Sequence, residues 1–232
     1  MTDMEIASGV HTLPQKIEPI TVDRNESTIT PLVVDGRPGP LLIDTTYPGE
    51  FDQLEHSLED LGWDLDALVG IVLTHQDIDH AGAVATAVDR ADLTVYAHEQ
   101  CAPYVTGRRP LVTQVQDTRY PPAPVDVELV DGVSFDTSAG PMAVIHTPGH
   151  SPGHISLYFR EERLLVTGDA MAAPDGTLEG PHEAYTPDMV TAWKSVERCA
   201  DLNIDRVLCH HGGLLDVGTA RIRELVETAD IE

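Results

Sequence analysis

Short apolar runs separated by turn residues open the chain. Residues 29–35 and 40–44 are apolar, and the Gly-Arg-Pro-Gly sequence at 36–39 between them predicts a β-hairpin. Apolar residues then recur at helical spacing over residues 51–61, and Gly62 is placed to end that helix. The pattern therefore predicts strands followed by a helix.

The next part of the chain repeats this order. The continuous apolar run at residues 68–73 is typical of a strand covered on both faces. A helix of small residues is predicted at 81–88 and a strand at 93–97. Further strands are predicted at residues 125–130, 133–135, 142–147, 154–159, 163–167 and 206–209.

Two helices are predicted towards the end of the chain. Thr186 is a suitable N-cap for the first, because Pro187 at the next position has no N–H to leave unpaired. The apolar face of this helix is predicted to contain Val190, Trp193, Val196 and Ala200. The last helix is predicted at residues 217–229, with Ile222, Leu225 and Val226 facing inward.

The order of these elements favours an α/β fold. Strands come in two groups, each followed by helices, as expected when two β-sheets pack together with helices on their outer faces. No linker divides the chain, so we expect one domain over residues 1–232.

The charge of the chain is unusual. It has 39 acidic and 14 basic residues, for a net charge of −25. Such a charge opposes a compact state in dilute salt, whereas at molar salt the Debye length falls to roughly 3 Å and the repulsion is screened. The composition resembles that of halophilic proteins, and it argues against binding of nucleic acid or anionic membranes.

Nothing in the sequence indicates secretion or membrane insertion. No apolar run is long enough to span a bilayer, and the acidic N-terminus lacks a signal-peptide pattern. Three scattered cysteines, Cys101, Cys199 and Cys209, favour buried thiols over a disulfide framework. We expect a soluble, cytoplasmic protein that acts on a small molecule.

Four short elements carry candidate metal ligands, and each follows a predicted strand. Residues 75–80, His-Gln-Asp-Ile-Asp-His, hold four potential ligands in six positions. The others are Thr-Pro-Gly-His at 147–150, Gly-Asp-Ala at 168–170 and His-His-Gly-Gly at 210–213. Imidazole suits zinc and iron, and carboxylate adds affinity for harder ions, so these elements together predict a metal site.

The order of these motifs resembles that of the metallo-β-lactamase superfamily over nearly the whole chain. The resemblance implies a four-layer αββα sandwich with the site at one edge between the sheets. It also implies two divalent metal ions, with zinc favoured and iron or manganese as alternatives. The implied ligands are His75, Asp77 and His150 for the first ion, Asp79, His80 and His211 for the second, and Asp169 between them.

Two positions depart from the family's pattern. The usual HxHxDH motif has histidine where this chain has Asp77, and the added carboxylate is expected to lower Lewis acidity and to favour iron or manganese. A small residue usually precedes the last histidine, where this chain has His210. We assign the ligand to His211, which directly precedes the glycine, and keep His210 as an alternative.

Metal-assisted hydrolysis is the leading hypothesis for activity. Two cations lower the pKa of a shared water to roughly 7, and the resulting hydroxide attacks an acyl carbon. Asp79 is predicted to orient that hydroxide besides binding metal. The expected substrate is an ester, thioester or lactone, as for glyoxalase II-like or lactonase-like enzymes. Residues 107–122 are interpreted either as a plain surface loop or as a substrate-facing lid, and Tyr185 either as a substrate contact or as a packing residue.

Two other functions stay open. The near-symmetric ligand set is similar to the HxExDH site of flavodiiron proteins, so a di-iron oxidoreductase with a separate electron donor is one alternative. The chain ends soon after His211 without a flavodoxin domain, which favours hydrolysis. A non-catalytic metal-binding module is the other alternative, and the complete ligand set counts against it.

Overall fold

Two large β-sheets form the body of the structure, a computed structural model that describes residues 4–17, 27–112 and 119–229. Within these residues the first sheet has seven strands in the order β1-β2-β5-β6-β7-β8-β9. Their bounds are Met4–Ala7 (β1), Val10–Thr12 (β2), Leu32–Val34 (β5), Leu41–Ile43 (β6), Gly70–Leu73 (β7), Thr94–His98 (β8) and Val127–Leu129 (β9). Because β6, β7 and β8 are parallel, their carboxyl ends meet at one edge of this sheet.

The second sheet has six strands within the described part of the chain, in the order β10 to β15. Their bounds are Ser134–Thr137 (β10), Gly140–His146 (β11), Ile155–Phe159 (β12), Leu164–Val166 (β13), Arg206–Cys209 (β14) and Gly213–Leu215 (β15). β13 and β14 are parallel, and β11 runs the same way because β12 is antiparallel to both β11 and β13. A separate antiparallel pair consists of β3 (Gln15–Ile17) and β4 (Ser27–Ile29).

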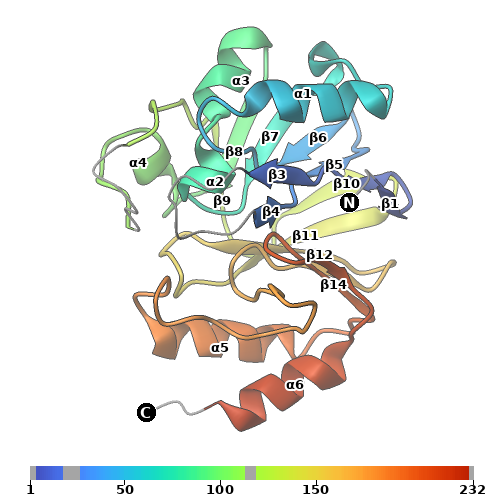
Figure 1. Cartoon of the computed structure of the whole chain (residues 1–232), viewed down its shortest axis with the longest axis vertical. Helices are drawn as coiled ribbons and strands as arrows, with labels where there is room; N and C mark the ends of the chain where they lie inside the picture. The colour runs from blue at the N-terminus through green and yellow to red at the C-terminus, as the bar shows by residue number, and fades with distance from the viewer. Residues whose placement is uncertain (1–3, 18–26, 113–118, 230–232) are drawn as a thin grey trace.

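Helices cover the outer face of each sheet, two above the first and two below the second in the view of Figure 1. The four are α1 (Phe51–Asp60) and α3 (Val84–Arg90) on the first sheet, and α5 (Met189–Cys199) and α6 (Thr219–Thr228) on the second. Shorter helices are η1 (Leu65–Ala67), α2 (Ile78–Ala81) and α4 (Ala102–Val105). Among the described residues, no helix has the length and apolar character needed to cross a membrane.

Apolar side chains fill three layers between these elements. In β7, Ile71 packs with the α1 and α3 side chains and Val72 packs against the second sheet, as expected for successive residues of a strand. In β12, Leu157 likewise faces the first sheet and Tyr158 faces the side chains of α5 and α6. The layers therefore lie in the order helix, sheet, sheet, helix, and the predicted αββα sandwich is confirmed.

The run at residues 29–35, predicted as one strand, is divided between two sheets. β4 ends at Ile29 and pairs with β3, whereas β5 begins at Leu32 and pairs with β2. Pro31 lies at the break, where it has no N–H to donate to a strand ladder. The hairpin predicted after this run is confirmed, since β5 and β6 are antiparallel.

The helix predicted at residues 81–88 is also divided. α2 begins earlier than predicted, at Ile78, and α3 begins only at Val84. Between them the N–H of Ala83 donates to the Thr45 side chain rather than to a carbonyl one turn before it. The interruption places Asp79 and His80 in the short helix α2, at the carboxyl edge of the sheet.

The N-cap predicted at Thr186 is wrong. α5 begins at Met189, and its N-cap is Asp188, whose carboxylate accepts the N–H of Thr191 at 3.0 Å. Of the predicted apolar face, Val196 and Ala200 are buried and Trp193 packs against the core, whereas Val190 is 44% exposed. The residues of α5 that are buried are Ala192, Ser195, Val196 and Cys199.

Candidate metal centre

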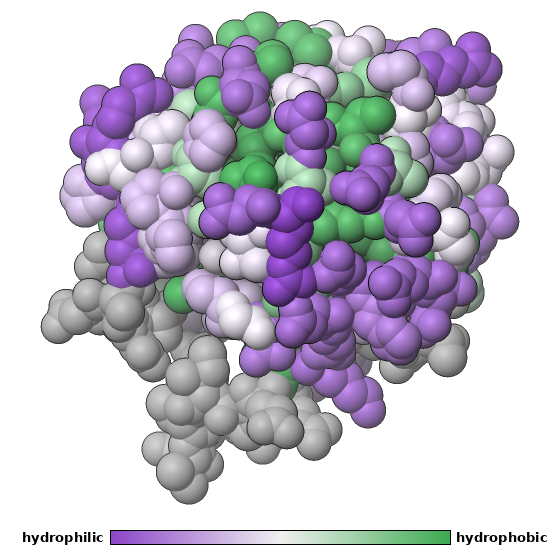
Figure 2. Space-filling view, turned by 90° about the horizontal axis from the view of Figure 1, so that it is seen from above, coloured by the Kyte–Doolittle hydropathy of each residue, from purple (hydrophilic) through white to green (hydrophobic). Residues whose placement is uncertain are grey.

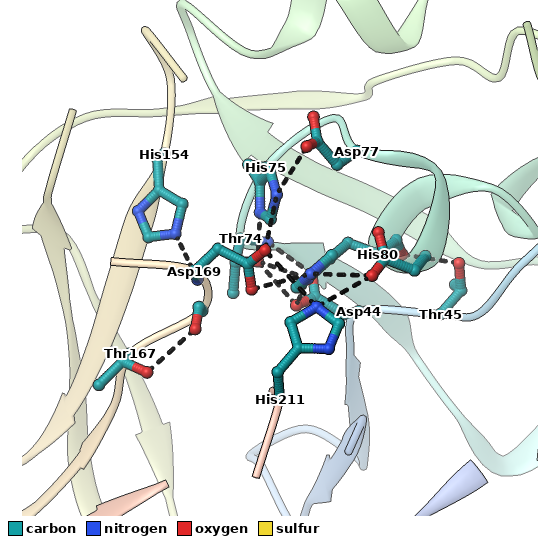
Figure 3. Close-up of polar contacts among 12 residues, drawn as sticks. Asp44, Thr45, Thr74, His75, Asp77, His80, His154, Thr167, Asp169 and His211 are labelled. Carbon is teal, nitrogen blue, oxygen red and sulfur yellow. Dashed lines mark hydrogen bonds and ion pairs between the residues drawn. The ribbon is translucent and has the colours of Figure 1, made fainter. Parts of the chain in front are cut away.

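The site is built from strand ends that meet at one edge of the sandwich (Figure 3). Asp44 lies at one of these strand ends, directly after β6. Its Oδ1 accepts the N–H of Thr74 at 2.7 Å, and its Oδ2 accepts the Thr74 hydroxyl at 2.7 Å and lies 2.8 Å from His80 Nδ1. Asp44 and Thr74 were not predicted to take part, although an aspartate that ends an apolar strand is the same signal that identified Asp169.

His75, Asp77 and His150 form the first cluster. His75 and Asp77 follow β7, and His150 lies in the loop between β11 and β12. His150 Nε2 is 3.1 Å from both His75 Nε2 and Asp77 Oδ2, and His75 Nε2 is 3.7 Å from the same Asp77 oxygen. The three side chains therefore direct one atom each at a common point, and all three residues are buried.

Asp79, His80 and His211 form the second cluster. Asp79 and His80 lie in α2, and His211 follows β14. Asp79 Oδ2 is 3.1 Å from His211 Nε2 and 4.0 Å from His80 Nε2. The His211 side chain is 34% exposed, whereas those of Asp79 and His80 are 12% and 0% exposed, so this cluster opens to solvent at His211.

Asp169, which follows β13, lies between the two clusters (Figure 3). Its Oδ2 is 3.8 Å from His150 Nε2 and 4.0 Å from His75 Nε2 on one side, and 3.6 Å from His211 Nε2 on the other. Its Oδ1 is 3.2 Å from His80 Nε2. One carboxylate thus faces histidines of both clusters, which is the arrangement of a binuclear metal site.

The distances between these atoms suit metal coordination. Two ligands about 2.1 Å from one ion at a tetrahedral angle lie roughly 3.4 Å apart, and the distances within the clusters run from 3.1 to 4.0 Å. His80 Nε2 and Asp169 Oδ1 are buried, and neither has a hydrogen-bond partner among the described residues despite their separation of 3.2 Å. Buried polar atoms of this kind require another partner, and a metal ion fits.

The loop that carries His150 is held against α5. Gly149 has φ +131°, and a Cβ at this position would lie 2.3 Å from the backbone nitrogen of Ala192 in α5. The Ser195 hydroxyl donates to the carbonyl of Pro148 at 2.7 Å. Glycine is therefore needed here both for its backbone conformation and for the close approach of the helix.

His154 positions Asp169 rather than joining the clusters. Its Nε2 accepts the N–H of Asp169 at 2.9 Å, so the ring proton lies on Nδ1, which faces the Thr147 hydroxyl at 2.8 Å. Gly168 has φ +53°, and a Cβ there would lie 2.6 Å from His154 Nε2. With both ring nitrogens engaged in this way, His154 lies outside the two clusters.

His210, the alternative to His211, lies next to the second cluster but in a different orientation. Its ring stacks on that of His80, with centroids 3.7 Å apart and an interplanar angle of 31°. A ring nitrogen of His210 nevertheless lies within 4.8 Å of the ligand atoms of Asp79, His80 and His211, and its Nε2 is buried with no hydrogen-bond partner among the described residues. The ring of His211 is inclined by 71° to that of His80, and His211 Nε2 faces Asp79 and Asp169. These contacts favour His211 as the ligand, and His210 lies close enough to stay the alternative.

The site concentrates opposite charges in a buried place. Burial raises the pKa of Asp79, but His80 and His211 outweigh this and hold it well below its usual value. Burial lowers the pKa of His211, but Asp169 and Asp79 outweigh this and raise it to about 10. The carboxylates thus favour positive charge at the centre, and bound protons compete with a metal ion for it.

The segment at residues 107–122, interpreted as a surface loop or a lid, lies partly outside the described residues, because residues 113–118 are not among them. Arg108, Arg109 and Arg119 each contact groups of the chain itself on α4 or β9. These contacts favour a plain surface loop over a lid. Tyr185 is 51% exposed, and its role as a substrate contact stays a prediction.

Known sequences resemble this chain in the region of the site. The family model described as the metallo-beta-lactamase superfamily matches residues 27–211. The probable metallo-hydrolase YflN of Bacillus subtilis strain 168 is 33% identical over 179 residues, which cover 62% of this chain and 64% of that protein. A hydroxyacylglutathione hydrolase of Cereibacter sphaeroides is 32% identical over 155 residues, covering 66% and 50%. The chain thus spans half to about two thirds of the length of these relatives.

Solved structures share the fold. A metallo-beta-lactamase family protein from Thermus thermophilus superposes with a TM-score of 0.73 at 24% identity, covering 94% of this chain and 78% of that one. A metallo-beta-lactamase from Pontibacter korlensis gives a TM-score of 0.74 at 16% identity, covering 98% and 99%. The matched family model and the shared sandwich agree with the resemblance of the motifs, and the chain belongs to the metallo-beta-lactamase superfamily.

Proposed function

We propose that this protein is a metal-dependent hydrolase that holds two metal ions in the two clusters. The observation that carries the proposal is the position of Asp169, whose carboxylate faces histidines of both clusters. Two ions that share one carboxylate lie close enough to act on one substrate. The proposed ligands are His75, Asp77 and His150 for the first ion, Asp79, His80 and His211 for the second, and Asp169 for both.

The reaction we propose is attack of water on an acyl carbon. Bound metal ions would supply Lewis acidity and lower the pKa of the attacking water. Asp79 would accept a hydrogen bond from that water and hold it in line with the acyl carbon. His211 marks the open side of the site, so we expect the substrate to approach from there, while buried Asp44 and His154 keep His80 and Asp169 in place.

An ester, thioester or lactone is the proposed substrate class, and zinc is the proposed metal. A thioester is the first compound to test, because one relative is named a hydroxyacylglutathione hydrolase. The first cluster consists of buried residues, whereas His211 of the second cluster is partly exposed. We therefore expect a substrate to reach the second ion directly. The proposal is limited to the class, because one fold and one metal site support many reactions.

The test combines metal analysis with a substrate panel. The protein, loaded with zinc, iron or manganese, is assayed on thioesters, esters, lactones and phosphodiesters. His75→Ala and Asp169→Ala should each lose metal and at least 100-fold in activity, as expected when a ligand is removed. His56→Ala is the matched control, since His56 is a surface histidine of α1 with a 72% exposed side chain. Full metal content in either ligand variant would refute the ligand set.

A di-iron oxidoreductase is the second candidate, and one observation favours it. With His211 as the ligand rather than His210, each proposed ligand set contains two histidines and one private aspartate, so the two halves are nearly equivalent. Such symmetry suits a pair of like ions that change oxidation state together. A colourless protein that is active with zinc supports hydrolysis, whereas iron-dependent consumption of O₂ with an added electron donor supports this alternative.

A further inference from the structure

Gln76 lies between two members of the first cluster and is fully buried. Its side-chain Nε2 donates to Asp77 Oδ1 at 2.6 Å. Its Oε1 is buried and has no hydrogen-bond partner among the described residues. A buried amide that leaves one end unpaired is unfavourable for folding, so the contact it does make calls for an explanation.

The two oxygens of Asp77 have different neighbours. Oδ1 receives the hydrogen bond from Gln76, whereas Oδ2 faces the cluster, 3.1 Å from His150 Nε2 and 3.7 Å from His75 Nε2. Figure 3 shows Asp77 beside His75, at the end of the site away from His211. The side chain does not serve as the cap of α2, although Asp77 is the N-cap residue. One oxygen of the carboxylate thus meets the amide, and the other faces the site.

Tyr120 holds the backbone of Gln76 from the other side. Its hydroxyl donates to the Gln76 carbonyl at 2.8 Å, and its side chain is almost fully buried. The neighbouring Arg119 donates to the carbonyls of Tyr104 and Val105 in α4, so the segment that carries Tyr120 is itself anchored. Burial raises the pKa of Tyr120 above its usual value, which keeps the phenol in the donating form.

We propose that Gln76 is a positioning residue that fixes Asp77 as a one-oxygen ligand of the first metal ion, with Tyr120 holding Gln76 in register. The inference rests on the proposed function, because it requires an ion in the first cluster. A free aspartate rotates readily about its last bond and binds an ion through either oxygen or both. The hydrogen bond from Gln76 to Oδ1 removes that freedom.

The consequence is selectivity among metals. Zinc prefers four ligands, whereas larger ions that bind oxygen accept more ligands and two-oxygen carboxylates. His75, His150, Asp169 and one oxygen of Asp77 supply four ligands to the first ion. Gln76 therefore favours zinc at a position where an unrestrained aspartate favours larger ions.

The test is a zinc titration against a chromophoric chelator, with two variants that remove the amide, Gln76→Leu and Gln76→Met. Each should bind one of its two zinc ions 10–100-fold more weakly than the wild type, as expected for loss of a group that orients a ligand. The same variants should lose less affinity for manganese. Tyr120→Phe, which removes only the hydroxyl, should lower the affinity for the same zinc ion by a smaller factor.

The matched control is Gln15→Leu. Gln15 is also a fully buried glutamine with an unpaired Oε1, but its amide donates to Ser57 and to the Leu13 carbonyl, away from the site. It should lower thermal stability without changing zinc affinity. If Gln15→Leu weakens zinc binding as much as Gln76→Leu, the effect is one of general stability and the inference is overturned.

A double-mutant cycle between positions 76 and 77 tests the contact itself. In an Asp77→His background the amide has no carboxylate to hold, so Gln76→Leu should change zinc affinity by less than 3-fold. An equal loss in both backgrounds would overturn the inference. The proposed function fails separately: a wild type that binds no metal refutes that proposal, whereas a wild type with two zinc ions and unchanged Gln76 variants refutes only the role of Gln76.

Discussion

Asp44 sets the orientation of two histidines, although it belongs to neither cluster. The Thr74 hydroxyl donates to Asp44 Oδ2, so the oxygen of that hydroxyl is free to accept from His75 Nδ1 at 3.1 Å. His80 Nδ1 donates directly to the same carboxylate. Both rings therefore carry their proton on Nδ1 and present an Nε2 lone pair to the site, as metal ligands require.

Replacing Asp44 by asparagine should disturb this arrangement. One amide oxygen replaces two acceptors, while the amide NH₂ faces donors from Thr74 or His80. We expect a 10–100-fold loss of zinc affinity in Asp44→Asn, because His80 is driven towards the tautomer with its proton on Nε2. Competition with a chelator measures this. Asp126→Asn is the control, since Asp126 also accepts a backbone N–H, that of Val95, but lies outside the site; an equal loss there would argue against the explanation.

The sequence identifies residues whose chemistry is informative by itself. Histidines and aspartates at strand ends are distinctive, and the structure brings the seven predicted ligands together, with His210 beside them. Tyr120 was not predicted, because its role depends on a contact with Gln76, 44 residues away in the sequence. Gln76 was not predicted either, because only the fold turns its side chain towards the neighbouring Asp77. Glutamine and tyrosine carry no signal of such a contact in the sequence.

At the scale of elements, strands that lie within apolar runs were predicted, and some short strands outside such runs were not. Residues 206–209 were predicted as a strand and form β14, and the run at 68–73 contains β7. β2, β3 and β15 were missed: each has three residues and lies outside a predicted apolar run, so periodicity does not distinguish it from a loop. Their partners in the sheets, rather than their own sequences, make them strands.

The contact between the His150 loop and α5 offers a test at this scale. Gly149→Ala adds a Cβ that would meet the backbone of Ala192, so the loop must move and carry His150 with it. We expect lower thermal stability and at least 10-fold weaker binding of one metal ion. Gly176→Ala is the control: Gly176 also has a positive φ, +74°, but a Cβ there meets nothing within 4 Å. It should lose some stability and no metal affinity, and a matching loss of metal would contradict the role of the loop.

At the scale of the whole molecule, the acidic residues of the described part lie mainly on the surface and rarely in the interior. Among the described residues, the buried acidic residues are Asp44, Asp77 and Asp79, all of which belong to the site. The other acidic side chains of the described part are at least partly exposed. Figure 2, seen from above α1 and α3, shows hydrophilic residues around smaller hydrophobic areas. In the described part of the chain, the acidic excess is therefore mainly a property of the surface.

This separation gives the salt prediction its physical basis. Repulsion between surface carboxylates destabilises the folded state, and raising KCl from 0.1 M to 1 M shortens the Debye length from about 10 Å to about 3 Å. We expect the midpoint of thermal unfolding to rise over this range and to change less above it. Sucrose is the control, because it stabilises by exclusion from the surface without screening charge. Equal stability in 0.1 M and 1 M KCl would contradict a surface adapted to high salt. An equal gain from sucrose would assign the effect to exclusion rather than to screening.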